Sequence, residues 1–366
     1  MDTAERNQQP QNRAIQPTQR GYLPWIILII GVSLSIVAFV QTKDWEQSVT
    51  HTDFEVLSAG HSAAVYNELS RHLDASAALL GLFDVSSQID RRQFTQFTKM
   101  LMANHSDFQA LMWAPRVAAS QRADLAQKAA EDGFMNFHIH DVDGNAMVDT
   151  TTTPTELSPI YYVYPEKSNE ELLGFDLMSD PAYRGLLESA RDSGQLTVSP
   201  PVQLDLKSGN GMGNGVLLIQ AVYLPDTNLE TVAGRRDGLR GYILQLFRIG
   251  DLIEEALRES AVLGLDISVV YGKDADETRL NYFHSSASRP DHIMDPSSRN
   301  PADGLRLRIP LDALGKSWGL MFTPAPRFWS NHQMWTSWAV LASGLLLTFC
   351  LTTMAILLGR RTAQTR

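Results

Sequence analysis

The chain has a long apolar run near each end, and between the runs apolar and polar positions alternate at shorter intervals. Residues Tyr22–Val40 contain no charged residue, and neither do residues Trp335–Leu358. Each run is close to the ~20 residues that an α-helix needs to cross the hydrocarbon core of a bilayer. The pattern therefore predicts two transmembrane helices, at residues 22–41 and 335–358.

A cleaved signal peptide is the alternative interpretation of the first run. The run is longer than the apolar region of a typical signal peptide, and no A-x-A-like cleavage site follows Val40. An uncleaved membrane anchor is therefore expected.

Charge in the flanking tails predicts the topology. Residues 1–21 carry a net charge of +1, residues 359–366 carry +3, and the two apolar runs carry none. Because positively charged flanks stay in the cytoplasm, both tails are predicted to be cytoplasmic. Since the net charge of the whole chain is -10 and the tails together carry +4, the enclosed segment carries a net charge of -14. This segment is predicted to lie outside the cytoplasm. Such an acidic segment lacks the basic surface that nucleic-acid binding needs, so no nucleic-acid partner is expected.

A repeat with steps of three and four residues follows the first apolar run. Its positions are Trp45, Val49, Thr52, Val56, Ala59, Ala63 and Tyr66 and, after one phase slip, Leu69, Leu73, Ser76, Leu80 and Phe83. A heptad-like seam of this kind is typical of a helix that packs against another element. The sequence therefore predicts a stalk helix at 43–90. Its seam is expected to pair across a homodimer, to pack on the chain's own domain, or to do both along different lengths.

Between the stalk and the second apolar run, helical and extended patterns alternate, which indicates an α+β fold. Helices are expected at 91–103, 120–133, 181–193 and 251–261. Strands are expected at 111–117, 134–140, 197–204, 216–224, 241–247, 266–271, 305–311 and 318–323. Asp180 is predicted to cap the third of these helices, and Gly194 is predicted to end it.

No arrangement of residues predicts a catalytic site, a cofactor or a metal centre. The one cysteine, Cys350, lies within the second apolar run, and neither G-x-S-x-G nor H-E-x-x-H occurs. His138 and His140 share a predicted strand face, but a metal site needs three or four ligands. Asp141–Asn145 resembles part of a calcium loop without the closing acid. Gly209–Gly215 precedes a strand rather than a helix, so it is expected to be a flexible turn.

Two motifs resemble the signature of CHASE domains. The first is LMWAPRV at Leu111–Val117, and the second is GFDLMSDP at Gly174–Pro181. The resemblance covers about residues 94–328. It implies an extracytoplasmic sensor similar to the ligand-binding part of plant cytokinin receptors. CHASE domains also occur in front of histidine kinases, diguanylate cyclases and phosphodiesterases, and they carry two PAS-like subdomains on a stalk helix.

The resemblance also implies where a ligand binds. In the plant receptors the acid of the D-x-M-S string hydrogen-bonds an adenine-type ligand, and Asp176 occupies the matching position. Val198 and Ser199 are implied to face the same pocket. From the residues alone, Asp176 has the alternative of ordering the turn before the helix at Asp180. Arg116 is expected to pair with Asp176, with a ligand carboxylate, or with another acid in an internal salt bridge.

The prediction for the whole chain is a two-pass membrane sensor without enzymatic activity, in the cell membrane, with a bacterial inner membrane and a periplasmic domain as the expected location. The predicted segments are a cytoplasmic tail (1–21), a transmembrane helix (22–41), the stalk (43–90), a membrane-distal PAS-like ligand-binding subdomain (91–237), a membrane-proximal PAS-like subdomain (238–330), a second transmembrane helix (335–358) and a second tail (359–366).

The expected partners are a small-molecule ligand, the membrane, a second copy of the chain and a separate cytoplasmic output protein. The output protein is expected because only eight residues follow the second apolar run. Two alternatives stay open. In the first, the chain is a ligand-free anchored scaffold. In the second, it is the truncated sensory part of a longer histidine kinase or cyclase receptor.

Overall fold

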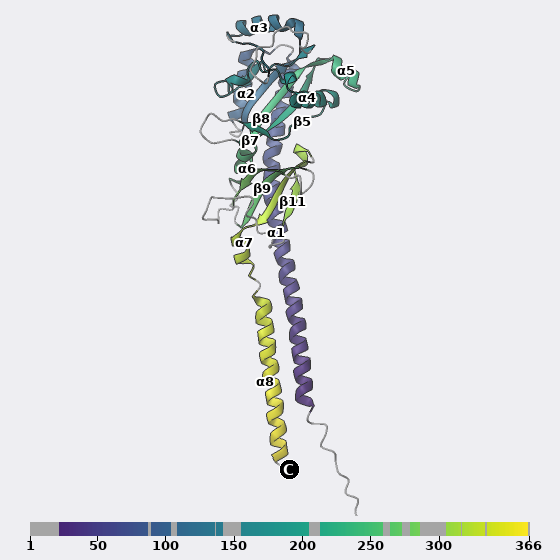
Figure 1. The fold of residues 1–366 in the computed structure, drawn as a ribbon, viewed down its shortest axis with the longest axis vertical. Helices are drawn as coiled ribbons and strands as arrows, with labels where there is room; N and C mark the ends of the chain where they lie inside the picture. Colours follow the sequence, from purple (N-terminus) through teal and green to yellow (C-terminus); the bar gives the residue numbers. More distant parts are fainter. Residues whose placement is uncertain are drawn as a thin grey trace, which may run out of the picture. The chain divides into compact units, whose positions relative to one another are not determined.

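The computed structural model describes residues 22–86, 89–103, 108–135, 137–141, 155–204, 213–258, 264–272, 279–285, 305–315, 317–333 and 335–364. The chain divides into two compact units, one of Met1–Phe54 with Ser330–Arg366 and one of Glu55–Trp329. Helix α1, Leu23–Val85, takes part in both units (Figure 1). The predicted first transmembrane helix and the stalk are thus one uninterrupted helix, which ends five residues before the predicted stalk end at 90.

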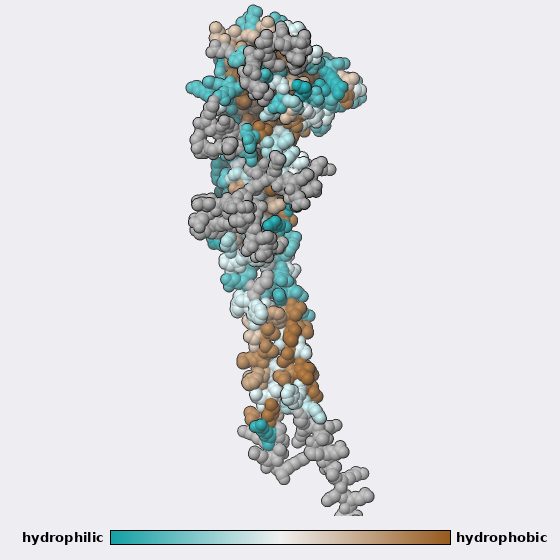
Figure 2. Space-filling model, in the orientation of Figure 1, coloured by the Kyte–Doolittle hydropathy of each residue, from teal (hydrophilic) through white to brown (hydrophobic). Residues whose placement is uncertain are grey.

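The first unit pairs the N-terminal part of α1 with α8 (Thr336–Gln364). α1 and the segment Pro326–Leu358 are each long and apolar enough to cross a membrane, and their apolar side chains form the brown surface in Figure 2. Small residues allow the two helices to approach closely. A Cβ added at Gly31 would lie 2.5 Å from the Thr348 side chain, and one at Gly344 would lie 2.5 Å from Oγ of Ser35.

The second unit holds two main antiparallel sheets and several helices. The helices after α1 are α2 (Arg91–Ala103), α3 (Arg122–Glu131), α4 (Pro181–Ser193), α5 (Val232–Asp237), α6 (Ile249–Leu257) and α7 (Pro326–Asn331). The first sheet contains β1 (Phe108–Pro115), β4 (Tyr162–Tyr164), β5 (Thr197–Val198), β6 (Val202–Leu204), β7 (Gly213–Tyr223) and β8 (Leu239–Arg248). The second contains β9 (Leu265–Tyr271), β10 (Arg279–His284), β11 (Leu307–Pro310) and β12 (Trp318–Pro324), and β2 (Val117–Ala118) pairs with β3 (Glu156–Leu157).

Strand β8 is central to the first sheet. The strand order is β4-β1-β8-β7-β5, with β6 also paired to β7, and the second sheet has the order β10-β9-β12-β11. The subdomain boundary predicted between residues 237 and 238 falls directly before β8. Strand β8 pairs with β1 on one side and with β7 on the other. The first sheet therefore extends past the predicted boundary to Arg248.

Helix α1 passes along both sheets of the second unit. The Tyr66 hydroxyl donates to the carbonyl of Pro310 beside the second sheet, and Ser76 donates to Gln245 of the first. The α1 side chains buried in this unit are Ser58, Ser62, Val65, Glu68, Leu69, His72, Ala75, Ser76, Leu79 and Phe83. The predicted seam thus coincides with the buried face at positions 69, 76 and 83, whereas positions 45, 49, 56, 59 and 63 are exposed.

The first sheet is covered on both faces. Leu111, Trp113 and Ile243 pack with Leu79 and Phe83 of α1 in one apolar cluster, which α2 and α3 extend. A second cluster on the opposite face joins other residues of β1, β7 and β8 to α4; it includes Met112, Leu217, Leu244, Leu187 and Ala190. Successive strand residues point to opposite faces, so β1 and β8 contribute to both clusters.

Two predicted strands differ in the structure. Residues 197–204 form two short strands because Pro200 and Pro201 interrupt the run and lack the N–H groups that a ladder needs. The predicted strand 134–140 is wrong for its described residues, since Phe134 and Phe137 lie in turns instead. Apart from the isolated bridge between His140 and Phe175, the described residues of this segment pair with no strand.

Candidate functional site

A cavity of about 680 Å³ lies against the face of the first sheet that α1 does not cover. Four strand residues form its floor, namely Met112 of β1, Leu217 of β7, and Leu244 and Leu246 of β8. All four are buried, with exposed fractions of 0–6%. This face is packed by α4 and by the short turns that precede it, and the cavity lies among them.

The wall of the cavity comes from the segment between β4 and α4. Leu172 ends a short 3₁₀ turn and Leu177 begins another, and both side chains line the cavity together with Phe175. Gly174 makes this path possible, because its φ is +84° and a Cβ there would lie 2.0 Å from the carbonyl oxygen of His138.

Asp176 holds this wall in place from behind. Its side chain is fully buried, and Oδ1 accepts hydrogen bonds from the backbone N–H groups of Ser158 at 2.7 Å and Met178 at 3.2 Å. Oδ2 has no hydrogen-bond partner among the described residues. Burial raises the pKa of Asp176, and the two backbone bonds and the charge of Arg184 oppose that rise. Arg184 itself donates to the carbonyl of Met178 at 2.7 and 2.9 Å.

α4 completes the wall through Tyr183. Asp180 caps the helix by accepting from the backbone N–H of Ala182 at 2.8 Å, and Gly194 ends it in the left-handed conformation, as predicted. The Tyr183 ring meets the Phe175 ring edge-on, with centroids 6.0 Å apart. Burial raises the pKa of Tyr183, so its phenol stays uncharged.

Polar lining residues gather at the mouth. Lys167, Glu170, Glu171 and Gln203 line the cavity and are exposed to solvent. The mouth therefore carries charges of both signs, whereas the floor is apolar.

Two amides between the mouth and the floor are engaged within the protein. The amide nitrogen of Asn169 donates to the carbonyl of Gln109 at 3.2 Å and to that of Pro165 at 2.7 Å. The Gln109 side-chain oxygen accepts from Arg248 at 2.7 and 3.2 Å. These amides stabilise the wall rather than offering free groups to the cavity.

The four residues predicted for the ligand site are not among those that line this cavity. Asp176 lies behind the wall, between the lining residues Phe175 and Leu177. Ser199 is buried, accepts from the backbone N–H of Leu217 at 3.0 Å and donates to the carbonyl of Pro200, and Val198 pairs with Leu218 in the sheet. Their role in ligand binding stays a prediction.

Arg116 forms an internal salt bridge with another acid, Glu156, which was one of the three expected alternatives. Its Nε donates to Glu156 at 3.1 Å and Nη1 donates to the carbonyl of Arg236 at 3.0 Å. The pair is about one third exposed on each side, with 30% and 35% of the two side chains accessible. It joins the end of β1 to β3 and contacts α5.

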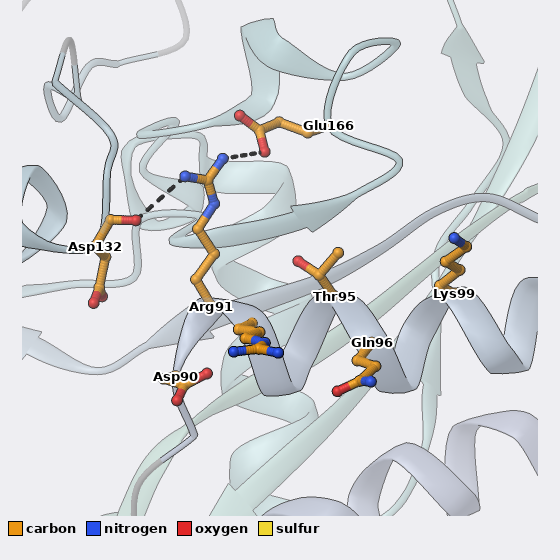
Figure 3. A pocket seen from close by; sticks show the side chains of 8 residues that line it. Asp90, Arg91, Thr95, Gln96, Lys99, Asp132 and Glu166 are labelled. Atoms are coloured by element: carbon orange, nitrogen blue, oxygen red, sulfur yellow. Dashed lines mark hydrogen bonds and ion pairs between the residues drawn. The ribbon is translucent and has the colours of Figure 1, made fainter.

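A second hollow, of about 740 Å³, lies beside the start of α2 (Figure 3). Arg91 reaches across it to Glu166 at 2.5 Å and to the backbone carbonyl of Asp132 at 3.2 Å, and its guanidinium also lies 3.9 Å from the centre of the Phe134 ring. Arg92, Gln96 and Lys99 on its rim are exposed. Of these two hollows in the described chain, the sheet cavity combines a buried apolar floor with a polar mouth, so we regard it as the candidate site.

No group of three or more His, Cys, Asp or Glu within the described ranges is placed to hold a metal ion. The rings of His138 and His140 lie 5.5 Å apart, and the described backbone places them in no strand ladder apart from one bridge at His140. The calcium-like segment and most of the glycine-rich run fall at 142–154 and 205–212, outside the described residues.

The floor residues Met112, Leu217, Leu244 and Leu246 were not predicted as site residues. Each lies in a segment that the sequence predicts to be a strand, but both faces of these strands are buried. The residues of both faces are therefore mostly apolar, and no regular alternation marks the face that borders a cavity.

A long helix that carries antiparallel sheets, one of them with an apolar cavity and a polar mouth, defines a helix-mounted α+β domain. The family model of the CHASE domain matches residues 87–282, a range that includes every lining residue of the cavity. The match covers more than half of the chain, so the chain belongs to the CHASE domain family, a family of extracellular sensor domains.

Two curated relatives of the chain are named as a histidine kinase and an adenylate cyclase. The chain is 24% identical to "Hybrid signal transduction histidine kinase A" of Dictyostelium discoideum, over 93% of this chain and 17% of that protein. It is also 24% identical to "Adenylate cyclase, germination specific" of the same organism, over 42% of this chain and 18% of that protein. The chain thus spans less than a fifth of the length of these relatives.

Two solved structures show weaker likeness. "Extracellular ligand binding receptor from Desulfohalobium retbaense DSM5692" has a TM-score of 0.41 at 11% identity, over 74% of this chain and 40% of that one. "Methyl-accepting Chemotaxis protein X" has a TM-score of 0.39 at 11% identity, over 76% and 99% of the two chains. Both scores are too low to define a shared fold, so these structures do not inform the site.

Proposed function

We propose that this chain is a membrane-anchored CHASE sensor in which a small molecule enters the cavity of the first sheet and changes how that sheet packs on α1. Membership of the CHASE family and the two candidate spans on either side of the domain support this function. The two tails are proposed to be cytoplasmic and the domain extracytoplasmic, in line with their charges.

The two-sided packing of β8 is the observation that carries the proposal. Leu244 and Leu246 line the cavity, while Gln245 between them accepts from Ser76 of α1 and donates to the carbonyl of His72 at 3.3 Å. A ligand that displaces the two leucines therefore acts on a strand whose opposite face is bonded to the stalk.

Strand β1 repeats this arrangement. Met112 lines the cavity, and the next residue, Trp113, packs on the Phe83 ring of α1 with centroids 4.2 Å apart. A ligand that binds one arrangement of sheet and helix better than another shifts the population toward it. Displacements of about 1–2 Å are typical of helix shifts in such transitions.

The output is proposed to be a cytoplasmic kinase or cyclase function, because the curated relatives are named as a histidine kinase and an adenylate cyclase. That output would reside in a separate protein or in a longer receptor, and the chain itself is proposed to be non-enzymatic. A homodimer is supported by apolar α1 residues that are exposed, including Trp45, Val49 and Val56. The PAS-like nature of the two sheets and a bacterial inner membrane remain proposals as well.

The test uses a side chain as a built-in occupant of the cavity. Leu244→Trp fills part of the space, and Leu246→Phe is a milder variant that guards against misfolding. Leu224→Trp is the matched control, because Leu224 is 51% exposed and outside the cavity. The full chain is reconstituted in nanodiscs, and amide hydrogen exchange is followed by mass spectrometry in peptides that cover residues 68–80 of α1.

Both cavity variants are expected to change exchange in this part of α1 by about fivefold, which corresponds to ~1 kcal/mol of local opening free energy. The control is expected to leave exchange there within about twofold. Unchanged exchange in α1, together with a native Tm for both cavity variants, would refute the proposed coupling.

A further inference from the structure

The buried inner surface of the cavity is mostly apolar. Its buried lining consists of Met112, Ile160, Leu177, Leu217, Leu244 and Leu246, with Asn169 as the buried polar member of the described lining. Phe175 and Tyr183 add two aromatic rings to the wall. A molecule inside this space would contact hydrocarbon and aromatic carbon over most of its surface.

The two amide side chains of the inner wall are already bonded to the protein. Both N–H groups of Asn169 have carbonyl acceptors, and Gln109 accepts from Arg248. In the part of the chain that the structure describes, no buried side-chain nitrogen or oxygen without a partner belongs to a residue of the lining. Among its side chains, the wall therefore offers a polar group that enters it little beyond the Tyr183 hydroxyl.

Charge is confined to the mouth. Lys167, Glu170 and Glu171 line the entrance and are exposed, whereas Asp176 is turned to the backbone of Ser158 and Met178 behind the wall. An ionised group on the inner side would lose its hydration without an opposite charge, and a single unpaired amide or hydroxyl would weaken binding by about 5- to 150-fold.

We propose that the cavity takes a small molecule with an uncharged, mostly apolar body whose polar group stays at the mouth. This ligand class rests on the proposed function of the same cavity. It differs from an adenine-type ligand held by Asp176, because Asp176 lies behind the wall rather than in the lining and the floor carries no group to pair with a polar ring edge.

Two dyes with one skeleton test the ligand class. N-phenyl-1-naphthylamine is neutral, and 8-anilino-1-naphthalenesulfonate adds an ionised sulfonate to the same anilinonaphthalene. The reporter is Val202→Cys in a Cys350→Ser background, because Val202 lines the cavity, is partly accessible and is close to cysteine in size. The matched control is Val232→Cys, on an exposed residue of α5 outside the cavity.

The full chain is held in nanodiscs, and the rate of reaction with methyl methanethiosulfonate is measured by mass spectrometry. Saturating neutral dye is expected to slow labelling of Val202→Cys by at least about fivefold, since an occupied cavity excludes the reagent. The sulfonate dye is expected to slow it less than about twofold, because burying the sulfonate is unfavourable. Neither dye should change labelling of Val232→Cys. Adding Lys167→Gln to the reporter should leave protection by the neutral dye within about twofold, because that charge is solvated.

Equal or stronger protection by the sulfonate dye would overturn the ligand class and leave a small-molecule cavity in place. A reactive Val202→Cys that neither dye protects would also overturn it. The hydrogen-exchange test with Leu244→Trp uses no ligand, so its outcome separates failure of the coupling from failure of the ligand class.

Discussion

Removing the Asp176 side chain is expected to loosen the wall of the cavity. Asp176→Ala leaves the backbone N–H groups of Ser158 and Met178 without the acceptor that now lies 2.7 and 3.2 Å away. An unmade hydrogen bond of a buried donor costs ~1–3 kcal/mol. The Ser158 bond is fully buried and the Met178 bond is partly buried, so the expected loss is about 2–4 kcal/mol.

Asp176→Asn is the matched variant. It keeps Oδ1 as an acceptor for both N–H groups and removes the ionisable group, but it places an amide nitrogen where Oδ2 has no partner among the described residues. Its expected loss is therefore about 1 kcal/mol. The difference between the two variants isolates the acceptor from the charge.

Tm is measured by intrinsic tryptophan fluorescence on the full chain in nanodiscs. At roughly 2 °C per kcal/mol for a unit of this size, Asp176→Ala should lower Tm by about 4–8 °C and Asp176→Asn by about 2 °C. Hydrogen exchange should rise in peptides that contain residues 156–160 and 174–179. A Tm for Asp176→Ala within about 1 °C of the parent, with unchanged local exchange, would refute this account of the wall.

Three further predictions follow from the described contacts. Burial raises the pKa of Asp176 above its ordinary value of 3.8 in the folded chain. The stability that comes from protonation of Asp176 is therefore full below pH 3.8, falls as pH rises through the raised pKa, and is constant above the raised pKa. Asp176→Asn should flatten this part of the Tm–pH profile. Gly174→Ala should lower the free energy of unfolding by more than ~3 kcal/mol, because its Cβ would lie 2.0 Å from a carbonyl oxygen at a φ of +84°. Gly185→Ala in α4 is the control, because its Cβ would meet open space, and it should raise the free energy of unfolding by about 0.5–1 kcal/mol. Thermal unfolding measures both. Gln245→Met and Ser76→Ala should each lower the free energy of unfolding by about 1–3 kcal/mol, because each leaves one partner of a buried hydrogen bond unpaired. The double variant should lose less than the sum of the two, because both partners of that bond are then apolar. Additive losses of Tm would contradict this coupling.

The local elements follow closely from the sequence because their signals are local. α2 occupies the predicted residues 91–103, and α4 begins after Asp180 and ends at Gly194 through the predicted caps. The long helix was also predictable, since no proline interrupts residues 25–85. The strand predicted at 134–140 failed because alternation alone does not supply a partner strand.

The functional residues likewise divide into those with a local sequence signal and those placed only by the folded domain. Two motifs were enough to indicate the CHASE family, because motif residues are adjacent in the chain. The position of Asp176 behind the wall depends on Ser158, which is 18 residues away and meets it only in the folded domain. The sequence likewise left the partner of Arg116 open between Asp176, a ligand carboxylate and another acid, and the pairing of β2 with β3 brings Glu156 to it.

By itself, the sequence determined the apolar helices, the charge difference between the tails and the enclosed domain, and the family. Each of these depends on composition or on short spacings along the chain. Only the tertiary structure decided which face of β1 and β8 borders the cavity and which face bonds to α1. Both faces are mostly apolar, so burial energy hardly distinguishes them, and the packing of α1 on one side and of α4 with the turns before it on the other makes the difference.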